Sequence, residues 1–409
     1  MNLLTELKEG LGISWSAIRA NKLRSILTTL GIVIGVVTVT LMGTAIEGLN
    51  RAFVQSISFI GADVLYVQRS DWFVRSHEEW VKMQKRRKVT LSQVDELERQ
   101  LTMASAIAPT ADSGETVRFK KHSADNVRII GTTEQFLATS GVSIAEGRFL
   151  SVAECNGGRP VCVIGSLVAT NLFQSDSPLG SKVTVDDRPF EVVGVLEKQG
   201  GFLDGGGLDN QVIVPLSQFT AAIWSNPDFG VQVKIKQVEQ LEDAKEELRV
   251  VMRKVRRLSP TDPDDFSINQ QDQVLGMFHK VAGTIAAVGL FVTGLSLFVG
   301  GIGIMNIMFV SVAERTREIG IRKAIGAKRR TILLQFLMEA ASICLLGGLV
   351  ALAIAWPLTL LMQKFLPATL SMTVVGIALL VSLVTGVISG FFPAWRAARM
   401  NPVDALRNE

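Results

Sequence analysis

The sequence has little of the chemistry on which enzymes and metal sites depend. Its three histidines, His77, His122 and His279, are scattered along the chain and lack the paired spacing of a zinc site. No Gly-x-Ser-x-Gly nucleophile motif is present. Segment 320–328 comes nearest to a phosphate-binding G-x-x-x-x-G-K-[ST] motif, but it fails on spacing and on the missing hydroxyl residue. We therefore expect no catalytic residue and no metal or other cofactor in this chain.

Charged side chains are absent from four long runs of the sequence. An ionisable group at the centre of a bilayer costs roughly 2.5 to 3.5 kcal/mol on insertion scales, which excludes charges from helices that cross it. A helix needs about 20 apolar residues to span the hydrocarbon core, and every run is longer than that. The sequence therefore predicts four transmembrane helices. The uncharged runs are 25–46, 281–313, 340–363 and 366–395.

The positive charges orient these helices. Segment 314–330, between the second and third runs, carries seven Lys or Arg residues, and loops this basic stay on the cytoplasmic side. Further Lys and Arg residues precede the first run and follow the fourth. We expect both termini in the cytoplasm and the long segment between the first two helices outside it. The basic residues gather at the membrane flanks, so lipid is an expected partner and nucleic acid is not.

The segment outside the cytoplasm mixes strand-like alternation with amphipathic helices, which predicts an α/β domain inserted between helices 1 and 2. A strand-rich insertion at about 112–228 predicts two subdomains, one nested in the other. Ser92 and Asp95 have the spacing of a helical capping box. The expected organisation is an amphipathic interfacial helix at 1–22, transmembrane helix 1 at 23–46, the α/β domain at 47–270, a stalk with transmembrane helix 2 at 271–313, a cytoplasmic loop at 314–330, transmembrane helices 3 and 4 at 331–363 and 369–395, and a cytoplasmic tail at 396–409.

Two groups of small residues invite a structural interpretation. Gly294, Gly300 and Gly301 lie in the second apolar run, where small residues let helices pack closely in lipid. Cys155 and Cys162 lie together in the exported domain. An oxidising exterior permits a disulfide between these two cysteines, and two reduced, buried thiols are the alternative.

Several blocks of the sequence resemble the MacB/FtsX-like permeases of ABC transporters. The first helix resembles theirs, and further blocks are similar to their periplasmic core domain, to their most recognisable membrane stretch and to their usual ending. The blocks are AIRANKLRSILTTLGIVIGV (17–36), GRFLSVAE (147–154), VIGSLVATNLF (163–173), GIGIMNIMFVSVAERTREIGIRKAIGAKRRTILLQFLMEA (301–340) and PAWRAARMNPVDALR (393–407).

The resemblance implies that loop 314–330 contains a coupling helix that docks on an ATPase. It further implies a homodimer working with two copies of a separate ATPase subunit, which binds ATP and Mg, because a macrolide exporter has its ATPase fused and this chain shows none. The residues that match the coupling segment are Glu314, Arg315, Glu318, Ile319, Gly320, Arg322, Lys323, Ala324, Gly326 and Ala327.

The function that the resemblance implies is export by mechanotransmission, in which ATP hydrolysis moves the extracytoplasmic domain. The chain would lie in the bacterial cytoplasmic (inner) membrane and drive a periplasmic adaptor and an outer-membrane channel. Two other functions within the family stay open at this point. One is a permease that releases lipoproteins from the membrane, and the other is a signalling subunit that regulates cell-wall hydrolases without transporting anything. The sequence identifies no substrate-binding residue.

Overall fold

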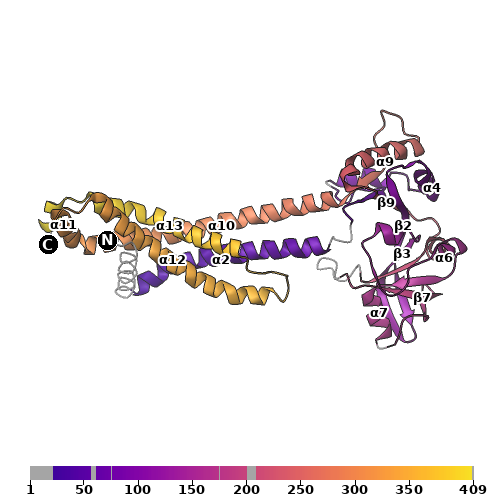
Figure 1. Cartoon of the computed structure of the whole chain (residues 1–409), viewed down its shortest axis with the longest axis horizontal. Coiled ribbons are helices and arrows are strands. Elements are labelled where there is room, and N and C mark those ends of the chain that lie inside the picture. Colours follow the sequence, from indigo (N-terminus) through magenta and orange to yellow (C-terminus); the bar gives the residue numbers. More distant parts are fainter. Residues whose placement is uncertain (1–21, 57–60, 75, 175, 200–208, 408–409) are drawn as a thin grey trace. The chain divides into compact units, whose positions relative to one another are not determined.

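The computed structural model describes residues 22–56, 61–74, 76–174, 176–199 and 209–407 (Figure 1). The chain divides into two compact units. The helical unit comprises the chain up to Arg51 and from His279 onward, and the α/β unit comprises Ala52–Phe278. The interfacial helix expected at 1–22 lies outside the described residues, apart from Lys22, which begins the first described helix.

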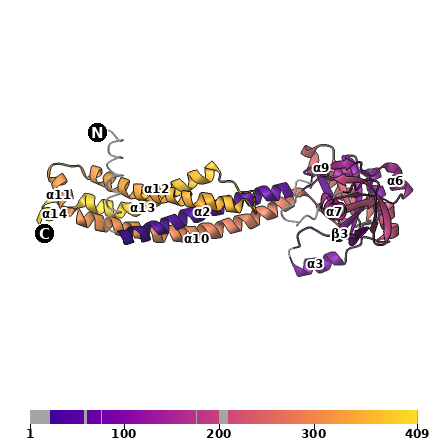
Figure 2. The ribbon, with the colours of Figure 1, turned by 90° about the horizontal axis from the view of Figure 1, so that it is seen from below.

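The helical unit contains four helices that are long and apolar enough to cross a membrane, with a mean hydropathy of 1.9 to 2.4. Their order and the α/β domain between the first and second of them confirm the predicted fold class. Two short helices, α11 and α14, lie at the same end of this unit (Figures 1 and 2). The helices are α2 (Lys22–Ser56), α10 (Gln271–Glu314), α11 (Thr316–Ala324), α12 (Arg329–Met362), α13 (Met372–Arg399) and α14 (Pro402–Arg407).

Glycines mark the close helix contacts of this unit. A Cβ atom on Gly300 would lie 3.0 Å from the backbone nitrogen of Ile32 in α2, so these two backbones approach directly. A Cβ on Gly301 would lie 2.5 Å from the hydroxyl of Ser389 in α13. Gly294 differs, because a Cβ there would meet nothing within 4 Å. Of the three glycines expected at packing contacts, Gly300 and Gly301 therefore face neighbouring helices of the described chain and Gly294 does not.

The α/β unit is built on one ten-stranded mixed sheet with the order β10-β1-β9-β2-β3-β8-β5-β7-β4, and β6 pairs with β2 and β7. The strand-rich insertion expected at about 112–228 supplies β3 to β8 and joins the rest through the long β2–β3 hairpin. The strands are β1 (Val64–Gln68), β2 (Ala104–Phe119), β3 (His122–Thr132), β4 (Ile144–Gly147), β5 (Val161–Ile164), β6 (Lys182–Val185), β7 (Arg188–Leu196), β8 (Gln211–Pro215), β9 (Gly230–Ile235) and β10 (Ser267–Asn269).

Helices accompany the sheet, and two of them, α4 and α9, pack against each other (Figure 1). Helix α4 begins two residues earlier than its sequence indicated. Its cap is Thr90, which forms a reciprocal capping box with Gln93, so the box expected at Ser92 and Asp95 is wrong. The helices of the unit are α3 (His77–Gln84), α4 (Leu91–Gln100), α5 (Phe136–Thr139), α6 (Val152–Gly157), α7 (Ser166–Phe173), α8 (Leu216–Ala222), the single 3₁₀ turn η1 (Val238–Gln240) and α9 (Leu241–Val255).

The two cysteines of this unit are separate, buried thiols, so the disulfide considered above is absent from the structure. The geometry of β5 explains why. Successive side chains of a strand point to opposite faces of the sheet. Val161 and Val163 pack in the same apolar cluster as Cys155, whereas Cys162 packs in the larger cluster on the other face. Burial in apolar surroundings raises the pKa of both thiols, that of Cys155 to about 12.

An ion pair between exposed Arg148 and the buried carboxylate of Glu154 links the segment before α6 to its first turn. The Glu154 side chain is only 5% exposed, and its carboxylate accepts hydrogen bonds from Arg148 Nη2 at 2.6 Å and from Ser151 Oγ at 2.7 Å. Hydrogen bonding to Arg148, and secondarily to Ser151, lowers the pKa of Glu154 from 4.5 to about 2. The folded state therefore holds this carboxylate ionised far below the pH at which the unfolded chain protonates it.

This ion pair predicts a pH-dependent contribution to stability. A lowered pKa stabilises the fold above the unfolded value near 4.5, and that contribution is lost as the pH falls toward about 2. We expect Glu154→Gln to lower the thermal unfolding midpoint of the α/β unit at about pH 7, and the difference from the unmodified chain to shrink as the pH falls below about 4.5. Asp187→Asn is the control, because Asp187 belongs to an ion pair with Arg118 and its side chain is 87% exposed. A constant difference at every pH would contradict the assignment.

Candidate coupling surface

The basic loop between α10 and α12 folds into the short helix α11. Arg315 precedes its first turn, and Gly326 ends it with a φ of +100°, a left-handed conformation that residues with a Cβ atom rarely adopt. The amide of Gly326 donates to the carbonyl of Lys323 at 3.0 Å, and the amide of Ala327 donates to the carbonyl of Arg322 at 3.0 Å. These bonds satisfy the last carbonyls of the helix, so the chain turns directly into α12.

One face of α11 is anchored to its own chain. Ile319 is 3% exposed and packs in the core cluster of the helical unit, and Gly320 beside it is also buried. Arg315 pairs with Glu339 of α12 at 3.4 Å. Lys323 donates to the carbonyl of Met400, between α13 and α14, at 2.5 Å. These contacts attach α11 to α12 and to the segment between α13 and α14.

Lys323, which holds α11 to Met400, lies close to another positive charge. Burial, and secondarily the positive charge of Arg329, lower the pKa of Lys323. The carbonyl oxygen of Met400 accepts a hydrogen bond from Lys323 and offsets part of that burial. Three of the seven positive charges of the segment therefore have partners within the chain, namely Arg315, Arg322 and Lys323.

The opposite face of α11 is exposed and mixes apolar with charged side chains. Ile321 is 44% exposed and Ile325 is 82% exposed. Glu318 and Arg322 pair beside them one turn apart, and Arg322 also donates to Oε1 of Gln335 at 2.7 Å. The four positions follow the spacing i, i+3, i+4 and i+7, which places them on one side of a helix. We call Glu318, Ile321, Arg322 and Ile325 the coupling face.

A groove lies beside α11, between the ends of α10 and α13 and the helix α14. Its volume is about 430 Å³. Phe309 and Met400 contribute apolar walls, and Arg396 and Asp404 contribute opposite charges. The Arg396 guanidinium lies over the Phe309 ring at 5.9 Å from its centroid, a cation–π contact that holds the charge at the rim. Thr316 of α11 also lines the groove, whereas the four residues of the coupling face do not.

The structure divides the ten coupling residues expected from the sequence into three groups. Ile319 and Gly320 are buried in the chain, so any contribution they make to a partner contact is through the shape of α11. Arg315, Lys323 and Ala327 are half-buried. Glu314, Glu318, Arg322, Ala324 and Gly326 are exposed. Ile321 and Ile325 were not among the ten predicted residues. The signal that could have identified them is a pair of isoleucines one turn apart in a basic loop.

The arrangement suits binding rather than chemistry. In the ranges that the structure describes, no three His, Cys, Asp or Glu residues converge in a way that could hold a metal ion. Exposed isoleucines between charged side chains are instead typical of a protein interface, where apolar anchors are surrounded by polar contacts.

Models of two protein families match this chain. A model described as the MacB-like periplasmic core domain matches residues 25–251. A model described as the FtsX-like permease C-terminal region matches residues 290–402, which includes α11 and most of α10, α12 and α13. Together the two models take in both units of the structure.

Individual relatives align along the whole chain. The uncharacterised ABC transporter permease YknZ of Bacillus subtilis is 33% identical over 98% of this chain and 100% of its own length. The macrolide export ATP-binding/permease protein MacB of Rhodopirellula baltica is 30% identical over 96% of this chain and 61% of its own length. The pyoverdine export ATP-binding/permease protein PvdT of Pseudomonas syringae pv. tomato is 32% identical over 99% of this chain and 60% of its own length. The chain thus spans about three fifths of the two ATP-binding/permease relatives.

Proposed function

This chain belongs to the MacB/FtsX-like permeases of ABC transporters, and from that premise we propose that the coupling face docks on a separate ATPase subunit whose ATP hydrolysis moves the α/β unit. The observation that carries the proposal is the coupling face itself. Ile325 is 82% exposed on a helix whose other face is anchored to the chain. A partner that covers this face would remove the apolar surface of Ile321 and Ile325 from water. Through α11, it would also be attached to the ends of the membrane helices.

The proposed mechanism is mechanotransmission. Closure of two ATPase subunits around ATP would displace the paired α11 helices, and the anchors at Glu339 and Met400 would pass that displacement into α12 and α13. Helices α2 and α10 each include residues of both units. Rigid-body movement of such helices is an established kind of switching transition, and it needs no substrate path between the spans.

The assembly follows from the same proposal. The protein is an inner-membrane protein with an extracytoplasmic domain, and we place both termini and α11 in the cytoplasm because of the basic loop. The permease would act as a homodimer with two ATPase copies, which bind ATP and Mg. It would drive a periplasmic adaptor and an outer-membrane channel. The names of two relatives specify different exported molecules, macrolides and pyoverdine, so membership of the family does not specify the substrate of this chain.

Purification of the intact complex tests the proposal. The full chain, tagged and isolated from its native membranes in mild detergent, is expected to retain an ATPase subunit at a one-to-one ratio of chains and an adaptor at a lower yield. Subunits are identified by mass spectrometry, and ATP hydrolysis is measured on the same sample. A complex without any ATPase would overturn the coupling assignment. A hydrolase of the cell wall in place of an adaptor would replace export with signalling.

A further inference from the structure

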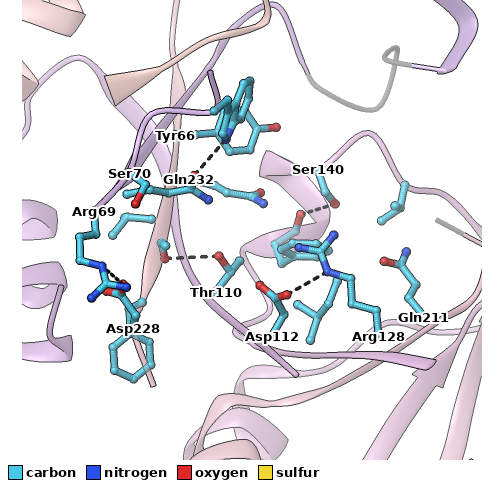
Figure 3. A pocket seen from close by; sticks show the side chains of 18 residues that line it. Tyr66, Arg69, Ser70, Thr110, Asp112, Arg128, Ser140, Gln211, Asp228 and Gln232 are labelled. Atoms are coloured by element: carbon cyan, nitrogen blue, oxygen red, sulfur yellow. Dashed lines mark hydrogen bonds and ion pairs between the residues drawn. The ribbon is translucent and has the colours of Figure 1, made fainter. Parts of the chain in front are cut away.

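A cavity of about 450 Å³ lies on the α/β unit (Figure 3). Its floor is one face of five adjacent strands, and the register shows this directly. Tyr66 of β1 lies opposite Gln232 of β9, Gly230 of β9 lies opposite Thr110 of β2, and Arg128 of β3 lies opposite Gln211 of β8. We call this space the sheet cavity.

The two faces of these strands differ in kind. Alternate residues such as Leu65, Val127 and Val212 point to the opposite face and pack in the large apolar core. The face toward the sheet cavity instead carries polar side chains, as on the water-facing side of an antiparallel sheet. This face is covered rather than open, because Phe136 of α5, Ser140 and Val142 form a wall beside it. Polar groups of the sheet and apolar groups of the wall thus face one cavity, a combination that small-molecule sites use.

Gln211 contributes a hydrogen-bonding group to the sheet cavity. Its residue is only 2% exposed, and its side-chain amide has no hydrogen-bond partner among the described residues. The amide contributes to the lining of the sheet cavity. The amide therefore offers a donor and an acceptor side by side to a bound molecule.

The charges around the sheet cavity balance. Arg69 pairs with Asp228 at 2.9 Å at one side, and Arg128 pairs with Asp112 at 3.3 Å at the other, as Figure 3 shows. Arg128 uses only Nε for this pair, and its two terminal nitrogens have no partner among the described residues. Two positive and two negative groups disfavour a ligand with net charge. They favour a neutral molecule that offers several donors and acceptors at different points.

Trp72 adds a fixed aromatic surface to the lining. Trp72 is half-buried, its ring packs on Tyr66 with the centroids 5.1 Å apart, and its indole nitrogen donates to Gln68 at 2.9 Å. The ring is thus held in place while part of its surface lines the cavity. A fixed aromatic surface among planar carboxylate, amide and guanidinium groups matches the two sides of a sugar ring, one carrying hydroxyls and the other formed by C–H groups.

We propose that the sheet cavity binds a neutral saccharide of one or two rings, with Gln211 and Arg128 hydrogen-bonding its polar groups and Trp72 packing against a ring face. The volume is near the lower end of the range for small-molecule sites, about 300 to 1,000 Å³, which fits a ligand of this size. The site lies in the α/β unit alone, so the proposal does not depend on the coupling face or on an ATPase.

Calorimetric titration of the full chain in lipid nanodiscs tests this proposal, with N,N′-diacetylchitobiose (called chitobiose below) as the probe because its acetamido groups match the amide of Gln211. We expect a dissociation constant below about 1 mM. Arg128→Gln and Gln211→Met are each expected to weaken binding about tenfold or more, the scale of a lost hydrogen bond to a charged or buried group.

The control variant is Arg118→Gln, since Arg118 is a comparably exposed arginine of β2 that pairs with Asp187 outside the cavity. It is expected to bind chitobiose as the unmodified chain does. Thermal unfolding of each variant shows whether the α/β unit stays folded. The side chain of Arg128 is 53% exposed, so Arg128→Gln is expected to fold. This variant still tests the proposal if Gln211→Met does not fold. Absence of chitobiose binding up to about 10 mM, equal weakening by all three variants, or binding of trialanine in place of chitobiose would each overturn the proposal.

Discussion

Ile325→Asp is expected to separate the permease from its ATPase while leaving the chain folded. Ile325 is 82% exposed, so the aspartate meets water in the free permease and costs the fold little. In the complex the carboxylate would be buried in an apolar contact without a partner, which is costly. Interface anchors of this kind contribute about 2 kcal/mol or more, so we expect ATPase affinity to fall at least thirtyfold, as measured by co-purification and by ATP hydrolysis in the reconstituted complex.

The matched control is Val250→Asp on α9, because Val250 is also apolar and is 64% exposed, but belongs to the α/β unit. It is expected to leave ATPase binding unchanged. Ile319→Ala makes a useful contrast. Ile319 is buried in the chain, so that variant should lower the thermal stability of the permease as well as ATPase binding. If Ile325→Asp retained the ATPase at the affinity of the unmodified chain, α11 would not be the docking element.

The parts of the fold that the sequence predicted are those determined by local composition. A transmembrane helix is recognisable because charge is excluded over its whole length. The capping box of α4 was placed at Ser92 instead of Thr90. Both residues offer a hydroxyl with a polar residue three positions later, and only the direction in which the chain enters the helix distinguishes them.

The parts that the sequence did not predict depend on contacts between distant segments. Which isoleucine of α11 faces inward is decided by its packing against other helices, so Ile319 is buried and Ile325 is exposed. The sheet cavity depends on the pairing of Arg128 with Gln211 across parallel strands. These two residues are far apart in the sequence, and alternation in each strand indicates only a polar face. The position of the basic segment was therefore predictable from the sequence, but which of its side chains are exposed was not.

The second large effect is expected from Arg315→Gln. Glu339 of α12 has a side chain that is only 5% exposed, and both of its carboxylate oxygens accept a hydrogen bond from Arg315 Nη1 at 3.4 Å. Removing the arginine leaves a buried carboxylate without its counter-charge, which costs about 3 to 5 kcal/mol in comparable pairs. We expect a markedly lower thermal unfolding midpoint of the helical unit. ATP hydrolysis should also become uncoupled, because α11 loses its attachment to α12.

A double-variant cycle separates this ion pair from a general loss of packing. Glu339→Gln combined with Arg315→Gln removes both charges, so the double variant should recover most of the stability that Arg315→Gln loses, because a neutral pair leaves no uncompensated buried charge. Glu318→Gln is the stability control: its pair with Arg322 has side chains 51% and 42% exposed, and such surface pairs contribute about 0.3 to 0.5 kcal/mol. Additive losses in the double variant would mean that Arg315 and Glu339 act independently. The anchor between α11 and α12 would then be the apolar packing of Ile319 alone, and the coupling proposed here would pass through that contact.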